Sequence, residues 1–143
     1  MIKYISDAEK TLTKLKKKKI KQIKKTKFNF STADIAPILR GLLSEKNDNK
    51  FILNFKKNNK LDYFINGKDI NRYSNEGTAT PDHVIRVKPF PLVISPKANC
   101  TLDEFKNLAE KKFKEYRQKY KKYFEANKKK TKEKKVMLDT SPR

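Results

Sequence analysis

One short stretch of the chain gathers the side chains best suited to binding anions or moving protons. The stretch is GTATPDHVIRVKPFPLV, residues 77–93, and its candidates are Thr80, Asp82, His83, Arg86 and Lys88. An Asp–His pair with nearby Thr, Arg and Lys can bind a sugar phosphate or act as an acid/base group. The same pair can instead have a purely structural role, in which Asp82 and His83 stabilise a turn. Pro81, just before them, biases Thr80 toward an extended backbone.

Several other kinds of site have no support in the sequence. No serine–histidine–acid order, phosphate-cradling glycine loop or metal-ligand spacing is evident. His83 and Cys100 are the only histidine and cysteine, so the chain cannot supply four zinc ligands of that kind. A single cysteine forms no intrachain disulfide and fits a reducing compartment. Without a secretory signal or a membrane-length apolar run, we expect a cytoplasmic protein with no membrane contact.

The basic charge of the chain is concentrated at its two ends. The net charge is +21, with eleven lysines against two acids in residues 1–30 and fifteen basic residues against six acids in residues 97–135. Residues 31–96 carry only ten basic residues against seven acids. Such ends can form a polyanion-binding surface, which makes a lysine-rich nucleic-acid-binding protein one candidate function.

A compositional explanation competes with nucleic-acid binding. Of the 37 basic residues only five are arginine, the side chain that makes bidentate contacts to bases and phosphates. An excess of lysine, asparagine and isoleucine is what an AT-rich genome produces. The charge alone therefore does not decide the function.

Helical patterns are predicted for both basic ends. Ser6 and Glu9 have capping-box spacing, and apolar residues at near-helical intervals follow as far as Ile23. Thr101 and Glu104 form a second capping box, which opens the strongest pattern in the chain. One side of this second helix is apolar and aromatic, through Leu102, Phe105, Leu108, Ala109, Phe113, Tyr116, Tyr120, Tyr123 and Phe124. Regular helical spacing favours core packing of these rings over stacking on nucleobases.

Between the ends we expect a short helix and a small sheet. Residues 31–44 show an apolar helical stripe, with Pro37 acceptable only in a first turn. Residues 51–55 and 61–65 read as the strands of a hairpin. Residues 68–76 read as a short helix ended by Gly77. Residues 84–87 favour a strand, and residues 92–94 favour an edge strand because prolines limit pairing.

Several segments resemble one enzyme family in the right order. TATPDHVIRVKPFPL (78–92), APILRGLLS (36–44), KFILNF (50–55) with FINGKDINRYSNEG (64–77), the helix from Phe105 to Tyr123 and MLDTSPR (137–143) carry the resemblance. They resemble the bifunctional class II aldolase/short-chain dehydrogenase family, which includes rhamnulose-1-phosphate aldolase/alcohol dehydrogenase. The resemblance covers most of the chain, and the Pro-Asp-His-x-x-Arg-x-Lys pattern is its most specific part.

The resemblance implies a metal and a cofactor that this chain cannot hold alone. In class II sugar-phosphate aldolases a divalent metal, usually zinc on histidines, stabilises the enediolate formed when a carbon–carbon bond breaks. The family's metal-binding histidines lie upstream of the matching region, and its NAD-binding glycine loop lies downstream. Here Gly41, Gly67 and Gly77 form no such loop. The resemblance implies an internal piece, a truncated frame or a split subunit that is inactive alone.

The sequence therefore predicts a mixed α/β (α+β) fold, a small mixed sheet with a hairpin flanked by basic amphipathic helices. Its expected parts are an N-terminal helix (1–27), a partial aldolase-like segment (28–100) and a C-terminal helix with its connection (101–143). No catalytic residue or metal ligand is assigned. The expected partners are the missing aldolase and dehydrogenase portions, or further copies of the chain. The candidates for substrate contact are Arg40, Thr80, Asp82, His83, Arg86 and Lys88.

Overall fold

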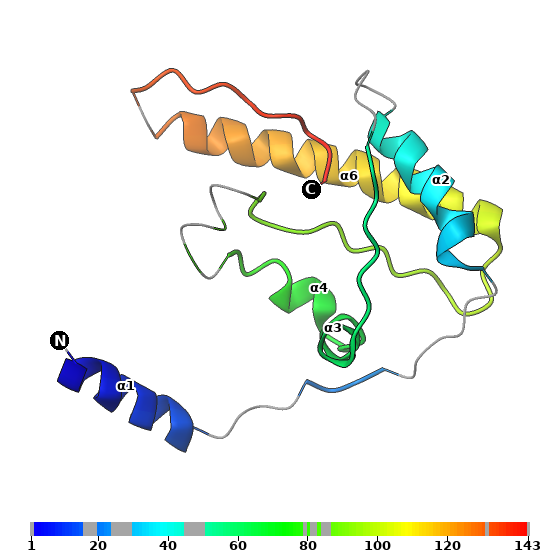
Figure 1. Ribbon diagram of the computed structural model, residues 1–143. Helices are drawn as coiled ribbons and strands as arrows, with labels where there is room; N and C mark the ends of the chain where they lie inside the picture. Colours follow the sequence, from blue (N-terminus) through cyan, green and yellow to red (C-terminus); the bar gives the residue numbers. More distant parts are fainter. Residues whose placement is uncertain are drawn as a thin grey trace.

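The protein is built from helices joined by long extended connections (Figure 1). The structure, a computed structural model, describes residues 2–15, 20–23, 30–44, 51–78, 80, 83, 87–130 and 132–142. The elements in chain order are α1 (Ile2–Lys14), α2 (Thr32–Ser44), α3 (Asn59–Ile65), α4 (Ile70–Tyr73) and α6 (Leu102–Lys128). About 55% of the described residues are helical and none forms a strand, so the predicted α/β fold with a small mixed sheet was wrong.

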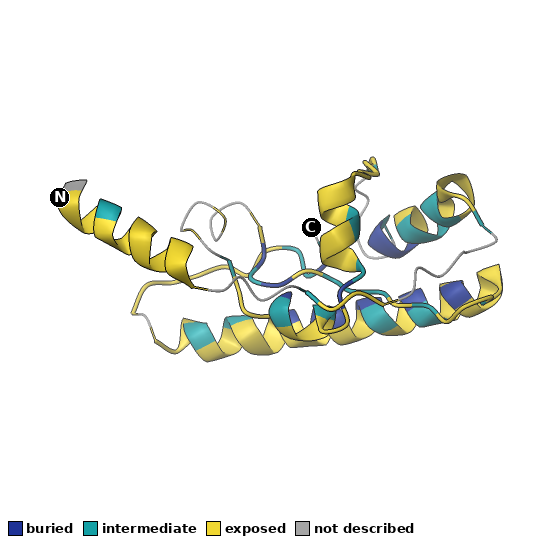
Figure 2. Cartoon of the chain, turned by 90° about the horizontal axis from the view of Figure 1, so that it is seen from below, coloured by how far each residue is buried: buried dark blue, intermediate teal, exposed yellow. Residues whose placement is uncertain are grey.

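Helix α6 is the axis of the fold, and its start was predicted correctly. The Thr101 hydroxyl accepts the Glu104 N–H at 3.2 Å, and the Glu104 carboxylate accepts the Thr101 N–H at 2.7 Å. This capping box satisfies two N–H groups that a helix start leaves unpaired. The buried residues of α6 lie on the side that faces the rest of the chain, while its outer side is exposed (Figure 2).

Helix α2 packs against α6 and makes the main apolar core with it. The buried members of this cluster are Leu42, Leu43, Phe105, Ala109 and Phe113. Ala109 is fully buried, and its small side chain allows close approach of the two helices. The prediction for Pro37 was wrong in detail, because α2 begins at Thr32 and the proline lies beyond the first turn.

The predicted hairpin is replaced by an extended segment and a helix. Residues 51–58 are extended without strand pairing, and α3 covers the second predicted strand. Asn58, read as part of a turn, is the N-cap of α3: its side chain accepts the Leu61 N–H at 2.8 Å. The apolar residues after it then fall at helical spacing, because Leu61, Phe64 and Ile65 are three and four positions apart.

The remaining predicted strands are also not formed. Residues 92–94 are extended, as expected, but pair with no described strand, and residues 84–86 lie outside the described residues. The predicted helix over 68–76 is limited to the single turn α4. Gly77 has a left-handed φ of 95°, which favours glycine, but it lies beyond the Ser74 C-cap and does not end this helix as predicted.

The N-terminal helix is shorter than predicted and begins earlier. α1 starts at Ile2, before the Ser6 capping box, and ends at Lys14. Residues 20–23 are not helical: Gln22 forms an antiparallel bridge to Gly67, with Lys68 N–H donating to the Lys21 carbonyl at 2.7 Å. A Cβ at Gly67 would lie 2.4 Å from Ile20, so glycine is required for this approach.

The apolar side of α1 is left uncovered in this arrangement. Ile5, Leu12 and Leu15 are each at least 60% exposed, and α1 stands apart from the other helices (Figures 1 and 2). None of the helices described here is long and apolar enough to cross a membrane.

Candidate functional site

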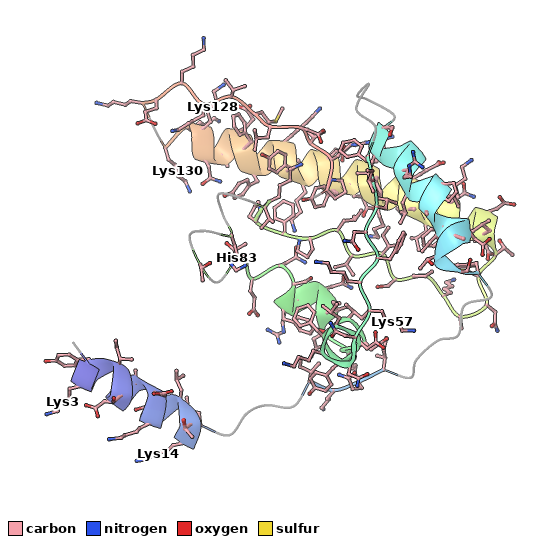
Figure 3. The ribbon with its side chains drawn as sticks, in the orientation of Figure 1. Lys3, Lys14, Lys57, His83, Lys128 and Lys130 are labelled. Carbon is pink, nitrogen blue, oxygen red and sulfur yellow. The ribbon has the colours of Figure 1, made fainter. Side chains whose placement is uncertain are left out.

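The loop after α4 presents the only histidine on the surface. Thr80 and His83 are both exposed, and the Thr80 Oγ1 lies 2.7 Å from the His83 Nδ1, within hydrogen-bond distance. Figure 3 places His83 on this loop, on the opposite side of the molecule from α2. The donor in this pair depends on the His83 tautomer. A hydroxyl that fixes one ring nitrogen leaves Nε2 oriented for a proton or a substrate oxygen.

The two candidates beside His83 cannot be placed in this site. Asp82 and Arg86 lie outside the described residues. The loop backbone around them is nevertheless partly defined, because the His83 N–H donates to the Thr80 carbonyl at 3.2 Å and the Val87 N–H to the His83 carbonyl at 2.8 Å. These bonds tie the His83 backbone to Thr80 and Val87, whereas the predicted roles of Asp82 fall outside the described residues.

Lys88 has a different environment from the one its sequence position suggested. It was a candidate for substrate contact, yet it is only 8% exposed. Its ammonium donates to the backbone carbonyls of Asp139 and Ser141, and it lies 4.5 Å from the Tyr120 ring centroid. The charge is therefore solvated by carbonyl dipoles and an aromatic face, as a buried ammonium requires.

The C-terminal segment provides half of this lysine site. Residues 132–142 run back alongside α6 (Figure 1), and Ser141 is 1% exposed. Asp139 accepts the Ser141 N–H at 3.1 Å, which fixes the turn that aims both carbonyls at Lys88. In this arrangement Lys88 binds its own chain and holds the C-terminal segment in place.

Tyr116 completes the apolar wall around Lys88. Its hydroxyl donates to the Phe90 carbonyl at 3.0 Å, and its ring meets the Phe90 ring edge-on with centroids 5.3 Å apart. Burial, with a smaller contribution from the neighbouring Tyr120, raises the pKa of Tyr116 to about 12. The tyrosine therefore stays protonated as a donor at any physiological pH.

Tyr116→Phe is expected to change the alkaline stability of the protein. The raised pKa means that the unfolded state loses the Tyr116 proton near pH 10 while the folded state keeps it to about 12. Stability from this group is thus fully present below pH 10 and is lost as the pH rises toward 12. The melting temperature is measured from pH 8 to 12 for both proteins. Above pH 10 it should fall less steeply with pH for Tyr116→Phe than for the parent protein.

The design of this test takes account of the groups packed against Tyr116. Tyr120 and Lys88 lie next to Tyr116 and are present in both proteins, so the difference between the two curves reports Tyr116. At neutral pH the variant should lose about 1 kcal/mol with the hydrogen bond to Phe90. Parallel curves would contradict the raised pKa.

Arg40 lies apart from the loop. It is exposed on α2, and no contact among the described residues joins it to Thr80, His83 or Lys88. Of the six sequence candidates, the described structure therefore brings together only Thr80 and His83.

The donor set does not fit the metal that the resemblance implies. No group of three histidine, cysteine or acidic side chains gathers within the described residues, and the whole sequence has one histidine and one cysteine. A site built from several histidines needs donors from outside this chain. The glycines likewise form no dinucleotide loop: Gly41 lies inside α2 and Gly67 at the bridge to Gln22.

Sequence reasoning missed the residues that surround Lys88. Tyr116 and Tyr120 were assigned correctly to core packing, but nothing in their spacing pointed to a buried lysine. Asp139 and Ser141 lie more than fifty positions away from Lys88 in the chain. A signal that could have pointed to this segment is the turn-forming sequence DTSPR, which follows an apolar run.

These features define a helical domain with one exposed histidine loop and with no cluster of metal ligands in the part of the chain that the structure describes. The chain belongs to the family described as aldolase class II, second domain, whose model matches residues 30–143. The class II aldolase part of the resemblance is therefore confirmed. Comparisons with curated proteins and with solved structures find no match.

Proposed function

We propose that this chain is the second domain of a class II aldolase that cleaves a ketose 1-phosphate of the rhamnulose 1-phosphate type, and that it is inactive alone. The family match over residues 30–143 supports the class II aldolase part of the proposal, and the resemblance of residues 78–92 to the bifunctional family supports the substrate. The shortage of metal donors supports the expected inactivity of the isolated chain, because metal-dependent cleavage needs histidines that this chain does not contain.

In the assembled enzyme His83 and Thr80 orient the substrate. An exposed imidazole with one nitrogen fixed by a hydroxyl can bind a substrate hydroxyl or a phosphate oxygen through the other. Asp82 and Arg86 adjoin this pair in the sequence and belong to the same proposed site. Lys88 instead anchors the domain, since its ammonium is already bound by two carbonyls.

We further propose that a short-chain dehydrogenase portion follows this domain in the complete enzyme. The support is the resemblance of residues 137–143 to the segment that precedes the dehydrogenase half in the bifunctional family. That portion would hold NAD, and the histidine-bearing portion would hold the divalent metal.

Co-expression with the histidine-bearing aldolase portion encoded in the same genome tests the proposal. The pure chain should not cleave rhamnulose 1-phosphate with added Zn²⁺, whereas the assembled protein should. His83→Asn should then lower kcat/KM by about a hundredfold, the loss expected when a substrate is held out of position. Lys57→Ala is the matched surface control, because Lys57 is exposed and lies elsewhere, near α3 (Figure 3). Metal-dependent cleavage by the pure chain would refute the proposal.

Nucleic-acid binding is the second candidate, and the exposed lysines favour it. The lysines labelled on α1 and at the end of α6 are exposed and lie in two separate groups on the same side of the view (Figure 3). They are Lys3, Lys14, Lys128 and Lys130. Lysine groups that lie on different segments favour contacts to phosphates by charge alone, without base readout.

We expect any binding to nucleic acid to be weak and to disappear near physiological salt. Titration of a fluorescent duplex at several salt concentrations measures the slope of log affinity against log salt. A steep slope with equal affinity for unrelated sequences identifies generic polycation behaviour. Tight binding that survives about 0.15 M salt would favour the nucleic-acid function over the aldolase function.

A further inference from the structure

The segment Leu92–Ser95 has an extended backbone with no backbone partner. It is bounded by Pro91 and Pro96, and none of its N–H or carbonyl groups forms a backbone hydrogen bond with the described residues. Leu92 and Ile94 pack against the core between α2 and α6, which holds the segment in place. A fixed strand with unpaired polar groups is a template for pairing with another strand.

A cavity lies along the same segment. It has a volume of about 400 Å³ and lies between Val93 and Ile94 on one side and Phe64 and Ile70 on the other. Ser74 lines it too, is 9% exposed, and its hydroxyl has no hydrogen-bond partner among the described residues. The cavity is thus mostly apolar, with Asn66, Ser74 and Ser95 as its polar lining, and it opens beside backbone groups without a backbone partner among the described residues.

This combination fits an extended peptide better than a compact small molecule. Strand addition takes its affinity from main-chain hydrogen bonds and its specificity from pockets for alternate side chains. The segment offers four residues of backbone, and the cavity is large enough for a side chain such as leucine or phenylalanine. The Ser74 hydroxyl can pair with a polar group of the incoming chain.

The charge of the chain decides between possible partners. Two copies of a chain with a net charge of +21 repel one another, whereas an acidic segment is attracted. We propose that the Leu92–Ser95 edge binds an extended strand of a separate polypeptide, with acidic residues at its ends and an apolar side chain that enters the cavity. The inference goes beyond the proposed function, because it depends on the backbone edge and the cavity, not on aldolase chemistry.

Peptide binding tests the proposal directly. The probe is a fluorescent nine-residue peptide with valine and threonine in alternation, a central leucine and aspartate at both ends. Fluorescence anisotropy should show binding, and amide hydrogen exchange should slow at residues 92–95. The same peptide with alternate backbone nitrogens methylated keeps its side chains but loses donors on one edge, and it should bind at least about tenfold more weakly.

Two variants locate the site on the protein. Val93→Asp places a carboxylate at the cavity and should weaken peptide binding about tenfold or more. Ile52→Asp is the control, because it makes a similar change on the extended segment 51–58, where Ile52 is 96% exposed. The control should leave peptide binding unchanged. Ser74→Leu, which fills the cavity, provides a second test if Val93→Asp unfolds. No binding, equal binding of the methylated peptide, or a dimer that protects residues 92–95 without peptide would each overturn the proposal.

Discussion

Lys88→Met is expected to release the C-terminal segment and to destabilise the protein by about 2–4 kcal/mol. The substitution keeps most of the side-chain volume but removes the ammonium that the Asp139 and Ser141 carbonyls accept from. Both carbonyls then lie beside an apolar side chain, and a buried polar group without its partner costs about 1–3 kcal/mol. Chemical denaturation measures the loss of stability.

Limited trypsin digestion shows whether the C-terminal segment has been released. Cleavage among the lysines of residues 132–135 should become faster in Lys88→Met, because the segment no longer has its anchor at Asp139 and Ser141. Lys97→Met is the matched control: Lys97 is exposed, and its loss should change neither stability nor cleavage by a measurable amount. If the two variants behave alike, Lys88 does not anchor the segment.

Helices α2 and α6 could be predicted from the sequence because local interactions determine them. The Thr101 and Glu104 side chains cap α6 within one turn, and the apolar stripe of that helix gives the spacing of its buried face. α2 was predicted within one residue at its start for the same reason, a stripe of apolar residues at intervals of three and four. Such signals need no knowledge of the rest of the chain.

The sheet was predicted wrongly because short apolar runs do not distinguish a strand from a helix. Residues 61–65 fit both periods, and the Asn58 cap decided for the helix. Residues 51–55 and 92–94 are extended as predicted, but a strand also needs a neighbour. Whether a neighbour exists is a property of distant chain segments, which a local pattern does not contain.

In the candidate site, too, some features follow from the local sequence and others depend on distant segments. Thr80 and His83 lie close together because they are only three positions apart and a backbone hydrogen bond joins them. The burial of Lys88 depends on a segment more than fifty residues later, so the local sequence around Lys88 could not predict it. The separation of Arg40 from the loop is likewise a tertiary fact: α2 packs against α6 through Leu42 and Leu43, and Arg40 faces solvent.

The uncovered surfaces suggest why the chain is so polar for its size. Its core is small, and Ile5, Leu12, Ile52 and Phe55 are all substantially exposed. A domain with unpaired extended segments and an uncovered helix face reaches full stability only when partner surfaces bury them. This agrees with the proposal that the second domain acts within a larger enzyme.

Arg117→Ala is expected to separate α2 from α6 and to destabilise the protein by about 2–4 kcal/mol. Arg117 is 8% exposed, and its Nη2 donates to the Leu42 carbonyl at 2.6 Å. That carbonyl belongs to the last turn of α2, whose carbonyls have no partner within the helix. A guanidinium there forms a charge-assisted hydrogen bond and opposes the negative end of the helix dipole. Its loss leaves a buried acceptor unpaired and opens space beside Phe113.

Urea denaturation and helical circular dichroism measure this effect. Arg117→Lys should recover only part of the stability, because an ammonium on a shorter chain keeps the charge without the planar reach of the guanidinium. Arg40→Ala removes an exposed arginine from α2 itself and should change stability by less than about 0.5 kcal/mol. A loss for Arg117→Ala no larger than that for Arg40→Ala would mean that the apolar cluster alone holds the two helices together. Full recovery by Arg117→Lys would assign the effect to charge at the end of α2, and not to the geometry of the bond to Leu42.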